Sequence, residues 1–291
     1  MEEPQTVFDL LVHMYPHAKK TTLREMLAHK RVRINGEVAR SLKQPVRKSD
    51  RLEVTDIAAS GHHQHNTVLS DGLRIAHLDS EIIIVEKPSG LLTATDSIEK
   101  RPYVLKLLTN YFKKQNHKNQ VHLIHRLDRD ASGLLVFART WNAYRSLKEQ
   151  FFEHTITRRY DVIVHGIPRK KEAKLENLLL EDPKTGEVRI TDDLRNGKLA
   201  ILSYLLMKSD PKKHIAHLKC ELFTGRKHQI RVQLKANGHV VCGDPMYGKA
   251  EEPPNRLALH ASHLTFVHPG TNRKVTFESP MPGSFNHMFL V

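Results

Sequence analysis

The sequence predicts an α+β protein of two domains, on the basis of composition, charge and hydrophobic pattern. Hydrophobic residues make up 39% of the 291 positions and charged residues 27%, which is the balance of a globular protein with a sizeable core. Residues 1–58 are strongly basic and combine helical with short strand patterns. Residues 59–70 have the composition of a linker. Residues 71–291 form a second domain, in which apolar strands, loops and a few helices alternate irregularly.

Two helices followed by short strands are predicted in the first domain. Apolar residues recur at helical spacing over 7–14 and again over 23–27. Residues 32–37 alternate in polarity and run into an Asn-Gly turn, which is typical of a hairpin. Residues 18–51 contain eleven Lys and Arg but only three acidic residues. This domain therefore presents a basic surface.

Four strands and two helices are predicted in the second domain. Their ranges are 82–85, 134–138, 160–164 and 216–222 for strands, and 104–112 and 141–151 for helices. Residues 229–237 fit either type, and their length and the following Gly238 favour a helix with a glycine cap. Residues 168–213 are predicted to form exposed hairpins or an insertion of unassigned role.

The charge and cysteine content limit the function classes. A net charge of +14 predicts a polyanionic partner, nucleic acid before an anionic membrane. The two cysteines exclude a disulfide framework and lack zinc-site spacing, and His62, His63 and His65 fit a polar linker better than a metal site. The N-terminus fits no secretory signal and no apolar run reaches membrane-spanning length. We therefore expect a cytoplasmic protein without membrane association or bound metal.

The densest polar cluster is HRLDRDASG at residues 125–133, directly before an apolar strand. A loop held by a strand suits a catalytic side chain. Asp128 and Asp130 could share acid–base work, bind a metal as in a nuclease, or form surface ion pairs with neighbouring arginines. A metal-dependent nuclease needs more acidic ligands than this loop offers. From these residues alone, catalysis and ion pairing both remain open.

A second cluster, TGRKHQIR, spans residues 224–231. Gly225 permits a close approach at a strand end, and two arginines with a glutamine amide suit a phosphate or carboxylate. A third cluster, GDPMYG at 243–248, is rich in turn residues. The sequence contains neither GxxxxGK[ST] nor GxGxxG, so nucleotide-driven or NAD chemistry has no support.

Several motifs occur in one order along the chain: KPSGL at 87–91, HRLD with SGL at 125–134, Tyr160, TGR with HQIR at 224–231, GD with YG at 243–248, HA at 260–261, and LTF with HP at 264–269. Together they resemble the RluA family of RNA pseudouridine synthases over residues 70–285. The basic N-terminal segment resembles an S4 RNA-binding domain. Ala131 and Gln233 depart from the family, which often has threonine and histidine there, but neither position carries its chemistry.

The resemblance implies a mixed, largely antiparallel sheet with flanking helices and an active-site cleft. It implies that Asp128 is the catalytic aspartate and that Arg231 is its cationic partner. Tyr160 would stack on the target base and then assist removal of the C5 proton. Other residues of the cleft expected to bind RNA are Arg126, which would help push the target nucleotide out of the stack or hold its phosphate, together with Arg226 and His125. The S4 residues expected to grip phosphates are Lys19, Lys20, Arg24, Lys30, Arg31 and Arg33.

The implied function is isomerisation of uridine to pseudouridine in structured RNA. Because no atoms are gained or lost, no cofactor is expected. Ribosomal RNA is the first expected target and transfer RNA the alternative, and a monomer is expected. A carboxylate beside a permanent cation such as Arg231 stays ionised, as the reaction requires. The competing hypothesis is a non-catalytic RNA-binding factor of ribosome assembly.

Overall fold

The chain forms two compact units, residues 1–65 and 66–291, each with its own hydrophobic core. Within them, the computed structural model describes residues 5–15, 20–28, 32–47, 49–54, 67–95, 101–115 and 121–290. In this part of the chain, no helix combines the length and the apolar character that crossing a bilayer requires.

The smaller unit packs two helices on a three-stranded antiparallel sheet of order β2-β1-β3. Its elements are α1 (Val7–Met14), α2 (Lys20–Ala28), β1 (Val32–Ile34), β2 (Glu37–Val38) and β3 (Leu52–Val54). The Thr6 side chain accepts the Asp9 N–H while the Asp9 carboxylate accepts the Thr6 N–H, so a capping box starts α1. Asn35 and Gly36 both have positive φ, which matches the tight hairpin turn predicted between β1 and β2.

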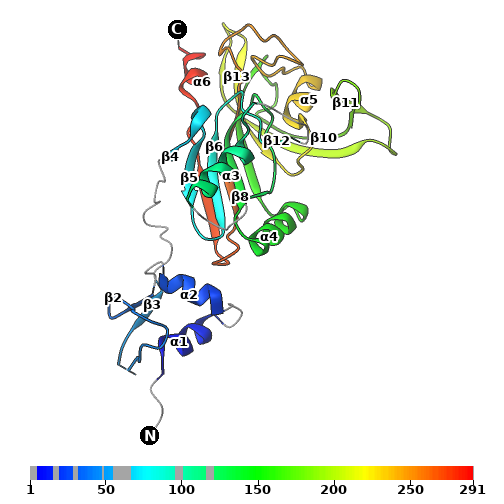
Figure 1. The fold of residues 1–291 in the computed structure, drawn as a ribbon. Helices are drawn as coiled ribbons and strands as arrows, with labels where there is room; N and C mark the ends of the chain where they lie inside the picture. Colours follow the sequence, from blue (N-terminus) through cyan, green and yellow to red (C-terminus); the bar gives the residue numbers. More distant parts are fainter. Residues whose placement is uncertain are drawn as a thin grey trace. The chain divides into compact units, whose positions relative to one another are not determined.

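The larger unit is built on one twelve-stranded sheet (Figure 1). Its main path has the order β11-β10-β12-β13-β9-β14-β8-β6-β5-β4, with β15 pairing β14 and β7 pairing β8. Every pairing is antiparallel except that of β14 with β8. The predicted mixed, largely antiparallel α+β fold is therefore confirmed.

The strands of this sheet are β4 (Thr67–Val68), β5 (Arg74–Leu78), β6 (Ile82–Lys87), β7 (His122–Leu123), β8 (Ser132–Ala138), β9 (Thr157–His165), β10 (Glu172–Glu181), β11 (Val188–Thr191), β12 (Lys198–Asp210), β13 (Ile215–Leu222), β14 (Leu259–Val267) and β15 (Lys274–Glu278). The helical segments are a 3₁₀ turn (Ser70–Gly72), α3 (Val104–Lys114), α4 (Trp141–Phe152), α5 (Gln229–Ala236) and α6 (Gly283–His287). Helix α4 packs on β8, and α5 packs on β10 and β11.

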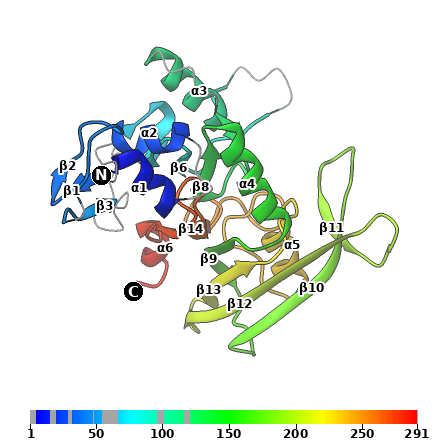
Figure 2. The same ribbon diagram turned by 90° about the horizontal axis from the view of Figure 1, so that it is seen from below.

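Two segments that the sequence left open take defined forms. Residues 229–236 form α5, and Gly238 follows it with φ +82°. Residues 168–213 supply β10, β11 and β12, which pair side by side at one edge of the sheet (Figure 2).

The last residues of the linker expected over 59–70 belong to the folded larger unit. Thr67–Val68 instead forms β4, where Thr67 pairs with Ile75 of β5. Main-chain pairing of a two-residue edge strand leaves no hydrophobic period, so the sequence pattern missed it. The earlier linker positions, with His62, His63 and His65, lie outside the described residues.

The parallel junction of β8 and β14 requires a glycine. Gly133 of β8 lies opposite Ala261 of β14, and Ala261 lies opposite Tyr160 of β9. Gly133 has φ +109°, and a Cβ there would lie 2.2 Å from the Ala261 carbonyl oxygen. Only glycine therefore lets the two strands meet beside Tyr160.

We expect Gly133→Ala to destabilise the larger unit by at least about 3 kcal/mol, because strain and overlap with backbone add together. Gly90→Ala is the matched control: Gly90 also has positive φ, but an added Cβ meets no atom within 4 Å. Its cost should be about 1 kcal/mol. Urea unfolding measures both, and equal losses would contradict the close-approach explanation.

Candidate active site

A cleft of about 1030 Å³ opens where the loop before β8, the end of α4, β9 and the start of α5 meet. Arginine and lysine side chains outnumber carboxylates along its walls. The cationic lining residues are Arg126, Arg129, Lys148, Arg158, Arg226, Lys227 and Arg231, and the acidic ones are Asp128 and Glu181. A cleft with this excess of positive charge attracts a polyanion.

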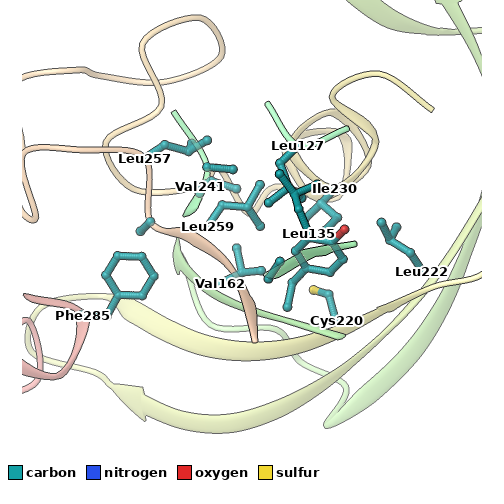
Figure 3. Close-up of a cluster of buried hydrophobic side chains, with 14 of the residues drawn as sticks. Leu127, Leu135, Val162, Cys220, Leu222, Ile230, Val241, Leu257, Leu259 and Phe285 are labelled. Atoms are coloured by element: carbon teal, nitrogen blue, oxygen red, sulfur yellow. The ribbon is translucent and has the colours of Figure 1, made fainter. Parts of the chain in front are cut away.

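Asp128 and Arg231 meet because their chain neighbours are buried in one hydrophobic cluster. Leu127 precedes Asp128 and Ile230 precedes Arg231, and both side chains lie together in the main core (Figure 3). Val162 of β9 belongs to the same cluster. Packing of these apolar side chains holds the β8 loop and the start of α5 at a fixed separation.

The Arg231 guanidinium bridges two carboxylates. Its Nη1 donates to Asp128 Oδ2 at 3.1 Å, while its Nε and Nη2 donate to the two oxygens of Asp244 at 2.8 and 2.7 Å. Asp244 is fully buried, and its Oδ1 also accepts the N–H groups of Met246 and Tyr247. Asp128 is the more exposed of the two carboxylates that Arg231 joins, and 23% of its side chain is exposed.

Charge complementarity keeps the buried pair ionised. Burial works to lower the pKa of the Arg231 guanidinium, but hydrogen bonds and the charge of Asp244, aided by Asp128, raise it above its ordinary value. Burial likewise works to raise the pKa of Asp244, and the Arg231 hydrogen bonds and charge hold it below its usual range. Arg231 thus presents a permanent positive charge to Asp128.

Tyr160 lies on β9 and lines the same cleft, although only 6% of its surface is exposed. Burial raises the pKa of its hydroxyl, and the nearby Arg158 charge works in the opposite direction. Tyr160 is therefore a neutral phenol at the base of the cleft, close to the residues predicted to act with it.

The structure also places Arg126 and Arg226 on the cleft, where both are exposed. Arg226 donates from Nε to the Leu199 carbonyl at 2.9 Å, which fixes its stem while leaving it at the rim. Within the described part of the chain, Arg126 makes no hydrogen bond or ion pair. Both arginines are thus available to a ligand entering the cleft.

His125 lines the cleft as a neutral ring. Its Nε2 accepts the Val136 N–H at 3.2 Å, and its ring stacks on Phe151 with centroids 4.8 Å apart. Burial, with the charges of Arg158 and Lys148, lowers its pKa to about 3. It therefore contributes shape to the cleft at neutral pH and no positive charge.

This lowered pKa predicts a pH-dependent stability. Between pH 6.5 and about 3, His125 binds a proton in the unfolded chain but not in the native one. Protonation therefore favours the unfolded chain, and the free energy of unfolding decreases as the pH falls through this window. The free energy of unfolding should fall by at most about 1.4 kcal/mol more per pH unit in wild type than in His125→Gln. Urea unfolding at pH 7 and pH 5 tests this, and parallel slopes would contradict it.

The loop that carries Asp128 is tied to the end of β6. Lys87 is 1% exposed, and its Nζ donates to the carbonyls of Pro88, Leu91 and Arg129 at 2.9, 2.7 and 2.8 Å. The Thr93 hydroxyl donates to the Leu127 carbonyl at 3.0 Å. The KPSG motif therefore positions the loop that carries Asp128. The sequence did not reveal this role, because nothing in the sequence distinguishes a buried lysine from an exposed one.

Arg158 is a second cationic residue that the sequence analysis missed. It lies on β9 with 7% exposure, its Nη2 donates to the Leu222 and Thr224 carbonyls, and its guanidinium lies 5.2 Å from the Phe151 ring centre. A Cβ on Gly225 would lie 2.8 Å from Arg158 Nη1. The absence of a side chain at Gly225 thus leaves space for this buried arginine.

The S4 residues predicted to bind RNA are only partly described. Lys20 and Arg24 of α2 are exposed, and the Lys20 ammonium lies 5.2 Å from the Phe8 ring centre. Arg33 on β1 donates to the Gly36 carbonyl at 2.7 Å. Lys19, Lys30 and Arg31 lie outside the described residues.

Both aspartates of the loop before β8, the metal ligands considered from the sequence, are paired with arginines. Asp128 pairs with Arg231, and Asp130 pairs with Arg129 at 3.1 Å. Among the described residues, the group suited to a metal is His165, Cys242 and Glu252, none of which lines the cleft. His165 and Glu252 already form a 2.7 Å contact, and burial raises the pKa of Cys242 to about 12. We therefore interpret this group as a structural contact.

Comparison with known proteins agrees with this geometry. Residues 81–236 match the family model described as RNA pseudouridylate synthase, which covers more than half of the chain. Residues 7–52 match the S4 domain.

Named relatives match most of the chain. A ribosomal large subunit pseudouridine synthase D of Zymomonas mobilis is 34% identical over 239 residues, covering 77% of this chain and 74% of the relative. The protein of the same name in Nitrosomonas europaea is 30% identical over 285 residues, covering 94% and 80%. An uncharacterised RNA pseudouridine synthase of Bacillus subtilis is 29% identical, covering 93% and 88%.

A solved structure, human RNA pseudouridylate synthase domain containing 4, shares the fold with a TM-score of 0.60. It is 21% identical and covers 73% of this chain and 90% of its own.

Proposed function

Because the chain belongs to the RNA pseudouridylate synthase family, we propose that it isomerises uridine to pseudouridine in ribosomal RNA, with Asp128 as the reacting carboxylate. The two family matches confirm the resemblance that the motifs and the basic N-terminal segment indicated, and with it the isomerase class. A ribosomal target also agrees with the cytoplasmic location expected from the sequence.

The observation that carries the proposal is the carboxylate pair around Arg231. Asp128 opens to the cleft while Asp244 holds Arg231 from behind by two hydrogen bonds. Arg231 therefore places a fixed positive charge beside the Asp128 carboxylate. Asp128 is thus suited to act as a nucleophile or base on a ligand in a cationic cleft.

The reaction breaks the N1–C1′ bond of uridine and joins C5 to C1′, and C5 then loses its proton while N1 gains one. Asp128 can attack C1′, remove the C2′ proton to give a glycal, or, in an older scheme, attack C6 of the uracil. Each route needs the uridine out of its stack, at a cost of about a few kcal/mol. Base stacking on Tyr160 can return about 1–3 kcal/mol, and the surrounding arginines bind phosphates.

The ribosomal target rests on the names of the relatives and on the S4 match. Mapping of pseudouridines in total RNA from cells with and without the protein tests it. We expect specific sites in large-subunit ribosomal RNA to disappear with the protein and to return with the wild-type gene. Loss of sites in transfer RNA alone would replace the target, and unchanged maps would favour a non-catalytic assembly factor.

A further inference from the structure

Three aromatic side chains, exposed Trp141 and half-buried Tyr144 and His122, form a platform at the start of α4. Trp141, the chain's one tryptophan, begins α4 and is 60% exposed. Its ring stacks on Tyr144, with centroids 4.8 Å apart and planes 17° from parallel. The His122 ring of β7 packs against both, at 5.8 and 5.6 Å. Leaving so large a ring in water forgoes hydrophobic stabilisation, which suggests a ligand for this aromatic platform.

The aromatic platform is fixed by packing and capping. The Thr140 hydroxyl accepts the Ala143 N–H at 3.1 Å and donates to the Glu81 carboxylate at 2.6 Å, which sets the start of α4. Ala143 and Leu147 are fully buried on the opposite side of this helix. The rings are therefore held in place before a ligand arrives, which lowers the entropy cost of binding.

The platform is continuous with the cleft along two routes. On α4, Trp141, Arg145, Lys148 and Phe152 follow each other at helical spacing on one face, and Lys148 and Phe152 line the cleft. From β7, the chain after His122 runs directly into the cleft-lining segment 123–129. Both routes lead from the three rings to Asp128.

Charge along this helix face suits a phosphate backbone. Both basic residues of this face are exposed, Arg145 next after Trp141 and Lys148 at the cleft. At 100° per residue, the acidic Glu149 lies about 80° around the helix from Trp141, at the edge of this stripe, and Glu153 follows the end of α4 at about 120°. Basic side chains interleaved with aromatic rings are typical of surfaces that bind single-stranded nucleic acid.

We propose that the aromatic platform binds an unpaired nucleobase of the RNA substrate, a few nucleotides along the strand from the target uridine. The proposal rests on the proposed function for its ligand class. Trp141 lies about 10 Å along the helix from Lys148, at 1.5 Å per residue. Stacked nucleotides advance about 3.4 Å each, so about three of them span this distance. The base would stack on the Trp141 ring while Arg145 and Lys148 bind the intervening phosphates.

Intrinsic fluorescence tests the contact directly, because Trp141 is the chain's only tryptophan. We expect a single-stranded adenosine decamer to quench this fluorescence at concentrations where anisotropy of the labelled decamer reports binding. The same decamer paired with its uridine complement should bind without comparable quenching. Binding of the single strand with unchanged fluorescence would overturn the proposal.

Kinetics separate a substrate contact from a structural role. Trp141→Ala should raise KM for unmodified ribosomal RNA by about 5- to 150-fold, the effect of losing one stacked base, with kcat nearly unchanged. Trp141→Phe should restore most of the affinity, since it keeps a ring. Leu194→Ala is the control, because Leu194 is 86% exposed but lies off the cleft. An unchanged KM in Trp141→Ala would overturn the proposal, as would a fall in kcat alone.

The two proposals fail separately in these experiments. If the chain binds and is quenched by single-stranded RNA but forms no pseudouridine, the proposed function is wrong and the platform stands. If pseudouridine forms at wild-type rates and affinity in Trp141→Ala, the platform is wrong and the function stands.

Discussion

Replacing Asp128 with asparagine should lower pseudouridine formation by at least about 10³-fold while RNA binding persists. Asparagine has nearly the same shape and can still accept the Arg231 Nη1–H, which lies 3.1 Å from Asp128 Oδ2. It lacks the negative charge that each chemical route requires. Release of tritium from RNA labelled at uridine C5 measures turnover, and a filter assay measures binding.

Asp130→Asn is the matched control for this variant. Asp130 stands two positions away in the same loop, but its carboxylate pairs with the half-exposed Arg129 and does not line the cleft. We expect its turnover to stay within about threefold of wild type, since exposed ion pairs contribute little. Substantial turnover in Asp128→Asn, or equal losses in both variants, would refute a catalytic role for Asp128.

Asp244→Asn should destabilise the larger unit by about 3–5 kcal/mol and lower kcat as well. Asp244 is fully buried and makes two hydrogen bonds to a guanidinium that is itself only 4% exposed. Removing its charge leaves Arg231 buried with Asp128 as its remaining carboxylate partner. Arg231 would then bind Asp128 more tightly and hold it back from the substrate. Urea unfolding and tritium release report the two effects separately.

Glu221→Gln provides the comparison for a surface pair of similar length. Arg159 Nε lies 2.7 Å from Glu221 Oε2, with 46% and 30% of the two side chains exposed. Loss of this ion pair should lower the free energy of unfolding by at most about 1 kcal/mol and leave kcat unchanged. A loss of stability in Asp244→Asn no larger than this would show that the buried pair is not what holds Arg231 in place.

Local pattern was sufficient for most of the secondary structure. Apolar spacing placed α1, α3, α4 and the central strands within a few residues of their observed bounds, because burial of one face leaves a period that reads along the chain. The same reasoning resolved 229–236 as α5 through Gly238. It failed for the two-residue strand β4, whose pairing depends on main-chain groups common to every residue.

The candidate site divides in the same way. The sequence by itself determined the α+β class, the basic character, the loop that carries Asp128 and, through resemblance, the expected partnership with Arg231. Only the tertiary structure decided that Asp244 holds Arg231, that Lys87 binds three loop carbonyls, that Arg158 is a buried residue of the cleft wall, and that Trp141 contacts His122. The physical reason is that a charged or aromatic side chain carries no mark of its burial or its partner. Burial and partners depend on which distant segments the packed core brings together, whereas a hydrophobic period is a pattern among residues close in the sequence.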